Sequence, residues 1–139
     1  MAESTDQKAN IQQPRQPKFI AVCHQKGGIG KTTTVCNLAA SVAHAGSGLR
    51  VVVIDLDPQG AASSQLGETD ELASIGAYDV IVSGEIGQGA IQTTKISNCL
   101  LVPATAQLAA PEADEAMRSL SYDDVRKQLI ENLAGTDLV

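Results

Sequence analysis

Residues 24–34 read HQKGGIGKTTT, and this stretch decides the fold. Glycines let a backbone curl so that its N–H groups converge on an anion. The run FIAVC at 19–23 precedes it and is typical of a strand buried on both faces, while residues 32–45 carry apolar side chains at helical spacing. A glycine loop between a buried strand and a helix indicates phosphate binding, because the helix N-terminus adds its dipole and free N–H groups.

The loop departs from the ordinary pattern G-x-x-x-x-G-K-[ST], because Gln25 stands at the position of the first glycine. Two functional side chains of that pattern are still present. Lys31 can reach the β- and γ-phosphates of a nucleotide, and the Thr32 hydroxyl can ligate Mg²⁺. The alternative is a tight glycine-rich turn with two solvated lysines. The ordinary motif does not explain the second lysine, Lys26.

A second motif, the acidic stretch DLDPQG at 55–60, follows the buried-strand run RVVVI at 50–54. Ligands of parallel α/β sheets lie at the carboxyl ends of the strands, so Asp55 and Asp57 are both expected near the phosphate site. One carboxylate can hold Mg²⁺ through water, and the other can orient or deprotonate an attacking water. The alternative is a strand-end aspartate that only caps a loop.

The order of the expected elements predicts an α/β domain with a parallel sheet and flanking helices. Residues 58–70 are expected to form a loop with one helical turn, and residues 136–139 resemble the opening of a fourth strand. Residues 1–17 are polar and predict a disordered tail, which leaves residues 18–139 as the domain. The expected strands lie at 19–23, 50–54 and 100–102, and the expected helices at 32–45, 74–83, 85–92, from Pro111, and from residue 122 to Gly135.

Composition limits the function classes. Three aromatic residues among 139 predict an aliphatic core, and a net charge of −6 argues against broad nucleic-acid binding by this chain alone.

The three cysteines, Cys23, Cys36 and Cys99, form no metal or disulfide pattern and predict reduced, buried thiols. No apolar run reaches the ~18 residues of a membrane span, and the polar N-terminal residues lack the apolar core that a signal peptide would have. We therefore expect a cytoplasmic protein without membrane contact.

KGGIGKTTT followed by DLDPQG resembles the ParA family of partition ATPases, within the deviant Walker A group that includes MinD. The stretches AYDVI (77–81) and LLVPATAQLAAPEADEA (100–116) fit the same pattern, and DPQ favours ParA over MinD. The resemblance covers about residues 18–139 and implies a P-loop NTPase fold of the SIMIBI type. It also implies ATP and Mg²⁺ as cofactors.

The function implied by the resemblance is chromosome or plasmid segregation through ATP-dependent dimerisation and DNA binding. A ParB-like partner would stimulate hydrolysis, and the protein would associate with the nucleoid. Among the residues, Lys26 would reach across a homodimer interface to the partner's phosphates and Asp57 would activate the attacking water, so both are predicted to be catalytic. Thr32 and Asp55 would hold the metal. The implied nucleotide-binding residues are Lys26, Gly27, Gly28, Ile29, Gly30, Lys31, Thr32 and Thr33.

Two departures from the family qualify these expectations. His24 stands where the family usually has Asn, and we expect no role for it. Family members also continue beyond Val139 with a fourth strand (Walker B), which would begin at about Asp137 and insert beside the phosphate loop, and with the DNA-binding regions. The chain therefore looks truncated before the Walker B strand, and ATP hydrolysis is expected of a full-length form. The alternatives are a non-hydrolysing nucleotide-binding fragment and a MinD-like membrane-cycling ATPase.

Overall fold

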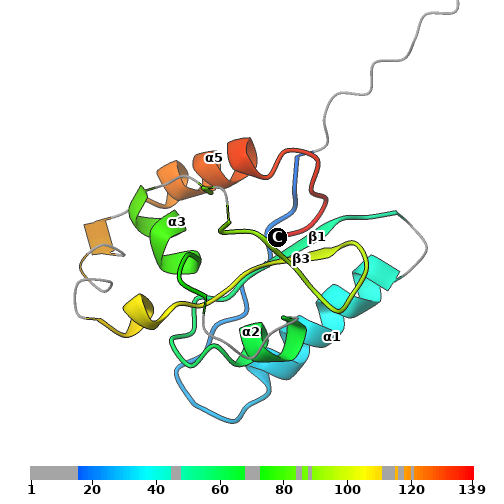
Figure 1. Cartoon of the computed structure of the whole chain (residues 1–139), viewed down its shortest axis with the longest axis horizontal. Coiled ribbons are helices and arrows are strands. Elements are labelled where there is room, and N and C mark those ends of the chain that lie inside the picture. The colour runs from blue at the N-terminus through cyan, green and yellow to red at the C-terminus, as the bar shows by residue number, and fades with distance from the viewer. Residues whose placement is uncertain are drawn as a thin grey trace, which may run out of the picture.

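The computed structural model describes residues 16–44, 48–67, 73–83, 86–87, 89–110, 115, 118–119 and 121–139. Helices cover both faces of a small sheet (Figure 1). Residues 1–15 of the expected tail and residues 111–114 of the expected helix at Pro111 lie outside the described residues. The alternation of strands and helices along the chain therefore gives the predicted α/β arrangement.

The sheet has three strands in the order β1-β3-β2. Strands β1 (Val51–Ile54) and β3 (Cys99–Val102) pair in parallel, as expected from the runs at 50–54 and 100–102. Strand β2 (Gln92–Thr93) pairs antiparallel with β3, so the sheet is mixed. The helix predicted over 85–92 is wrong for the described residues of that range. Gly87 and Gly89 interrupt it, and Gly89 has a φ of 94°, which no α-helix accepts.

Four of the described helices match the expected pattern in position. The longest, α1 (Lys31–His44), follows the glycine loop, and α3 (Ala77–Ser83) and α5 (Tyr122–Asn132) lie where helices were predicted. The single turn expected within 58–70 is the six-residue helix α2 (Ala61–Leu66). A 3₁₀ helix, η1 (Ala106–Ala109), follows β3. Within the described part of the chain, none of the helices has the length and apolar character that crossing a membrane requires.

Alternate side chains of β1 and β3 point to opposite faces and form two core clusters. Val53 and Leu101 pack toward α1 and α2, together with Cys36 and Ala39. Val52 and Val102 belong to the other cluster, with residues of α3 and with Leu133, next to the end of α5. Because both faces of the strands are covered, their sequences are apolar at every position.

Residues 19–23, predicted to be a strand buried on both faces, differ from that prediction. The structure gives them no regular strand, and Ile20 is 51% exposed. Residues 137–139 lie between this segment and β1, where they pair with both neighbours: the Ile20 N–H donates to the Val139 carbonyl (2.8 Å), and the Val52 N–H donates to the Leu138 carbonyl (2.9 Å). The expected insertion of residues 136–139 is thus confirmed, but the pairing with residues 19–23 stops at Ile20.

Arg50 fixes the position of this inserted segment. Its backbone N–H donates to the Asp137 carboxylate (2.9 Å), and its Nε donates to the Gly135 carbonyl (2.7 Å). Gly135 has a φ of 83°, and a Cβ there would collide with the Arg50 guanidinium. The turn after α5 therefore requires glycine, and it delivers residues 137–139 into the sheet.

Candidate phosphate-binding site

The glycine loop begins after residue 23 and ends at the start of α1, at the lower edge of the molecule (Figure 1). Gly28 and Gly30 have φ values of 72° and 90°, a region that side chains other than glycine rarely adopt. A Cβ added to Gly27, Gly28 or Gly30 would meet no atom within 4 Å. The glycines are thus needed for backbone conformation, and the space beside them is open to a ligand.

The N–H groups of the loop and the first turn of α1 form the predicted anion site. Thr34 is the first helix residue to donate, to the Gly30 carbonyl (2.8 Å). The backbone N–H groups of residues 27–33 donate to no backbone acceptor among the described residues. The first N–H groups of a helix lack partners and carry its positive dipole end, so this loop offers a cluster of donors to phosphate oxygens.

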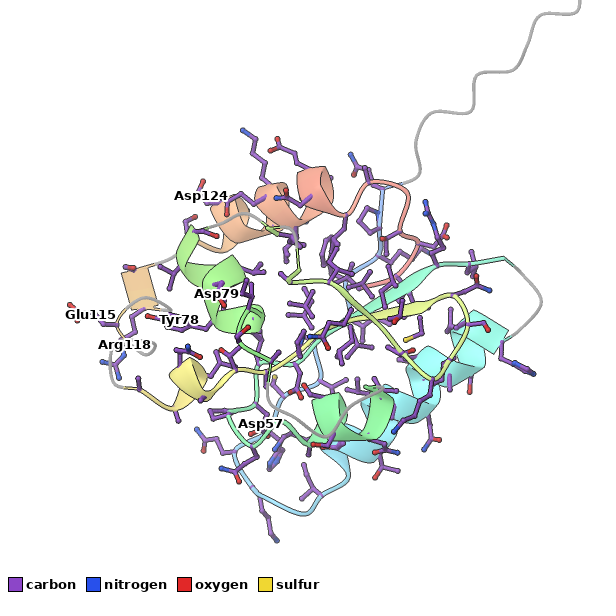
Figure 2. The ribbon with its side chains drawn as sticks, in the orientation of Figure 1. Asp57, Tyr78, Asp79, Glu115, Arg118 and Asp124 are labelled. Carbon is purple, nitrogen blue, oxygen red and sulfur yellow. The ribbon has the colours of Figure 1, made fainter. Side chains whose placement is uncertain are left out.

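Lys31 and Asp57 approach each other at the mouth of this site. Lys31 Nζ lies 3.9 Å from Asp57 Oδ2, and Figure 2 shows Asp57 beside the glycine loop. The other Asp57 oxygen accepts from the Gln59 N–H (3.0 Å), which holds the turn after β1. The two side chains are 27% and 39% exposed, so their attraction is screened by water and contributes at most about 1 kcal/mol. A phosphate could replace Asp57 as the partner of Lys31.

Asp55 has a different role from its neighbour, because it is only 6% exposed and its carboxylate is heavily hydrogen-bonded. Its Oδ2 accepts from the Ser63 N–H (2.8 Å) and the Ser63 hydroxyl (2.7 Å), and its Oδ1 accepts from the Asp57 N–H (3.2 Å). Asp55 thereby satisfies one of the free N–H groups in the first turn of α2, that of Ser63, from outside the helix.

Ser63 joins the carboxyl ends of β1 and β3, and sequence reasoning missed it. Its hydroxyl donates to Asp55 and accepts from the Ala104 N–H (2.9 Å), two residues past β3. The only sequence signal was a serine in the short helix that follows a strand-end aspartate. The position of Ala104, which lies 41 residues further along the chain, could not be inferred from that signal.

The predicted metal residues, Thr32 and Asp55, line one cavity at the ends of β1 and α1. Mg²⁺ commonly keeps several waters and needs only one or two carboxylates beside substrate phosphates. Asp55 Oδ1 has a single, long hydrogen bond, and a carboxylate oxygen has two lone pairs, so it can still accept a metal-bound water. The residues fit a hydrated ion. The described residues contain no group of three or more His, Cys, Asp or Glu side chains that would form an all-protein metal site.

The remaining predicted loop residues differ in exposure. Thr32 is half-buried at the helix start, Thr33 is exposed, and Ile29 is 48% exposed at the loop. Lys26 is also exposed, and its N–H donates to His24 Nδ1 (2.9 Å). His24, for which no role was expected, therefore shapes the loop at Lys26. The predicted contact of Lys26 is with a second molecule and stays a prediction.

The cysteines are not part of this site. Cys36 and Cys99 are buried, as predicted, whereas Cys23 is exposed, so the prediction of a buried thiol is wrong there. Burial raises the pKa of the Cys36 thiol, and the negative charge of Asp55 adds to that rise. Burial also raises the pKa of the Cys99 thiol. Both buried thiols therefore remain protonated at neutral pH and serve as core side chains.

Comparison with known proteins places these features in a family. The family described as AAA domain matches residues 17–135. The chain is 45% identical over 111 residues to the chromosome-partitioning ATPase Soj of Thermus thermophilus, a match over 75% of this chain and 42% of the relative. It is 37% identical over 97 residues to the chromosome partitioning protein ParA of Myxococcus xanthus, over 70% of this chain and 34% of that protein. The chain thus spans about two-fifths of the length of these relatives.

A solved structure gives the same fold. The crystal structure of cobyrinic acid a,c-diamide synthase from Mycobacterium smegmatis, with bound ATP analogue and magnesium, superposes with a TM-score of 0.73 at 31% identity. The match covers 88% of this chain and 49% of the synthase. The predicted P-loop fold is therefore confirmed. The chain belongs to the AAA domain family, as an amino-terminal part of a ParA-type partition ATPase.

Proposed function

We propose that the protein represented by this chain binds and hydrolyses ATP and acts in DNA segregation. The observation that carries the proposal is the open glycine loop at the start of α1. Its N–H groups lack backbone partners among the described residues, and Lys31 and Asp57 face each other at its mouth. The names of the relatives, a chromosome-partitioning ATPase and a chromosome partitioning protein, support the biological role.

In this proposal the residues of the loop bind the phosphates. The N–H groups of residues 27–33 hold phosphate oxygens, and Lys31 leaves Asp57 to neutralise the β- and γ-phosphates. The Thr32 hydroxyl and the Asp55 carboxylate hold Mg²⁺, which when bound neutralises phosphate charge. Asp57, released from Lys31 and open to water, orients the attacking water and accepts its proton.

Lys26 acts between two molecules in the proposed cycle. It is exposed on the loop, and its N–H bond to His24 positions the backbone beside the phosphate site. A cation delivered by a partner would stabilise the transferred phosphoryl group and would link nucleotide binding to homodimer formation. We further propose a cytoplasmic, nucleoid-associated protein that is stimulated by a ParB-like partner and that binds DNA outside residues 1–139.

Nucleotide binding tests the site directly. We expect the 139-residue chain to bind a fluorescent ATP analogue in the presence of Mg²⁺, and Lys31→Ala to weaken binding at least about tenfold, because it removes a charge-assisted contact. Lys95→Ala is the matched control, since Lys95 is an exposed lysine after β2 and outside the site. Equal affinity in both variants, or no binding by a chain that unfolds cooperatively, would contradict the proposal.

The catalytic roles require a longer form that hydrolyses ATP. There, Lys26→Gln should abolish ATP-dependent dimerisation in sedimentation experiments, whereas Asp57→Ala should keep the dimer and stop phosphate release. Dimerisation and turnover unchanged in both variants would refute these two assignments. ATP binding without any phosphate release by the longer form would instead support a non-hydrolysing nucleotide-binding protein.

A further inference from the structure

His24 forms a hydrogen bond at the entrance of the phosphate loop. The Lys26 N–H donates to His24 Nδ1 at 2.9 Å, and both residues are exposed. A side chain that accepts from the N–H group two residues further along closes a tight turn and fixes the backbone of the second residue. His24 thus holds the backbone of Lys26, the residue proposed above to act on a second molecule.

The bond to His24 also separates Lys26 from the phosphate donors that follow it. The N–H groups of residues 27–33 donate to no backbone acceptor among the described residues, whereas the Lys26 N–H is satisfied by the imidazole. A satisfied N–H gains less from a phosphate oxygen than a free one does. The backbone of Lys26 therefore lies at the boundary of the anion site, and its exposed ammonium group is left for a contact outside the chain's own phosphate site.

Acceptance at Nδ1 sets the protonation state in which this turn exists. A neutral imidazole accepts at one nitrogen and donates at the other, so the ring that accepts from Lys26 carries its proton on Nε2. Uptake of a second proton makes both ring nitrogens donors. Two donors would then face each other in the turn, so the bond is lost and the Lys26 backbone is released. Histidine side chains ordinarily make this change between about pH 5 and 8.

We propose that His24 is a positioning residue for Lys26: the neutral imidazole holds Lys26 for its contact with a second molecule, and the imidazolium releases it. ATP-dependent pairing of two chains then weakens as the pH falls, while the N–H groups of residues 27–33 and Lys31 still bind the nucleotide. The inference rests on the proposed function, because it assumes that Lys26 acts in trans. It gives a role to a residue for which the sequence predicted none.

Other titratable or charged groups surround the imidazole, and their effect must be separated from its own. Those that line the same cavity as His24 are Cys23 on its own segment, Lys31 of α1, Asp55 and Asp57 after β1, and Arg126 of α5. A change in any of these groups acts on the chain whether or not the imidazole is present. Replacing His24 by an uncharged acceptor therefore isolates the effect of its protonation.

Sedimentation of the longer form with saturating ATP and Mg²⁺, near pH 6 and near pH 8, tests the proposal. The unmodified protein should pair at least about tenfold more weakly near pH 6, because a homodimer loses two such bonds, each worth a few-fold in affinity. His24→Asn should pair equally at both pH values, since an Asn side chain accepts from the N–H two residues on and does not titrate. His24→Ala has no acceptor, and near pH 8 it should pair as weakly as the unmodified protein does near pH 6.

His44→Asn is the matched control for the pH profile. His44 is the other of the two histidines, and it ends the 14-residue helix α1, about 20 Å from the loop. This variant should keep the pH profile of the unmodified protein. An unchanged pH profile in His24→Asn would overturn the inference and leave the proposed function intact. Absence of pairing near pH 8 in the unmodified protein would refute the proposed trans role of Lys26, and the inference with it.

Nuclear magnetic resonance of the 139-residue chain tests the hydrogen bond without nucleotide or pairing. The Lys26 amide proton should move upfield as the imidazole is protonated, with the same midpoint as the ring protons of His24. His24→Asn should abolish this movement, and the titration of His44 should leave the Lys26 amide unchanged. A Lys26 amide that stays fixed while His24 titrates would refute the bond on which the proposal depends.

Discussion

Residues 19–23 (FIAVC) and β1 (Val51–Ile54) have similar sequences and different environments. Both are continuous apolar runs followed by a loop that carries predicted site residues. Val51 and Val52 are 2% and 1% exposed, whereas Ile20 is 51% exposed. The difference is in pairing: β1 pairs with β3 over its full length, while residues 19–23 pair only as far as Ile20. An apolar run therefore shows that a segment can be a buried strand, and neighbours on both sides decide whether it is one.

The largest effect on stability is expected when a buried side chain is removed from the paired region. Leu101→Ala should lower the free energy of unfolding by about 2–5 kcal/mol, because Leu101 is 1% exposed and its loss leaves a cavity against α1. Ile20→Ala should cost less than about 1 kcal/mol, since half of that side chain is already in water. Urea unfolding of the two variants measures both. Equal losses would mean that residues 19–23 contribute to the core.

The reactivity of the three thiols compares the exposure of residues 19–23 with that of β3 and α1, and it requires no mutation. At pH 8 we expect an alkylating reagent to modify exposed Cys23 at least about 100-fold faster than buried Cys36 or Cys99, because burial blocks access and the raised pKa of both thiols lowers their thiolate fraction. Mass spectrometry of peptides at successive times gives the three rates. In concentrated urea the rates should converge. Similar rates in the folded chain would contradict the burial of β3 and α1.

Ser63→Ala tests the connection between the ends of β1 and β3. It removes the hydroxyl between Asp55 and the Ala104 N–H and should cost about 1–3 kcal/mol in unfolding free energy, because buried groups lose a partner. Ser64→Ala is the control in the same helix, and Ser64 is exposed, so its effect should stay within about 0.5 kcal/mol. Thermal or urea unfolding distinguishes them. Identical stabilities would show that the bond does not stabilise the fold.

The smallest effect is expected at the phosphate loop. Lys31→Met should change the free energy of unfolding by less than about 1 kcal/mol, because its pair with Asp57 is long and open to water. The difference from the unmodified chain should shrink further at high salt, which screens exposed charges. A loss comparable with that of Leu101→Ala would mean that the ion pair is part of the core.

Local patterns were sufficient for much of the fold. The strands β1 and β3 and the helix α1 follow from continuous apolar runs and helical spacing. The sequence of residues 136–139 indicated only the opening of a strand, and its insertion was implied by the resemblance to the ParA family. Strand β2 was missed because it is two residues long and exists only through its pairing with β3. The glycines at 87 and 89 were a signal against the helix that was expected there.

The sequence predicted which residues lie near the site, but it did not predict the different environments of the two aspartates. The proximity of Lys31 and Asp57 follows from their places at a helix start and a strand end. The burial of Asp55 and the exposure of Asp57 could not be inferred, because the two aspartates have the same local sequence context. The position of α2 decides the difference, since it brings Ser63 to Asp55.

The bridge between Lys18 and Leu138 has a consequence for the order in which the molecule can assemble. The two residues are 120 positions apart, so closing them carries a large loop-closure entropy and depends on the turn at Gly135 being formed. During synthesis from the N-terminus, the segment before the glycine loop is made early and gains its sheet partner only after about 120 further residues. Until Leu138 is available, residues 19–23 remain an apolar segment without this neighbour, so we expect the segment before the phosphate loop to take its final position only after residues 137–139 have been made.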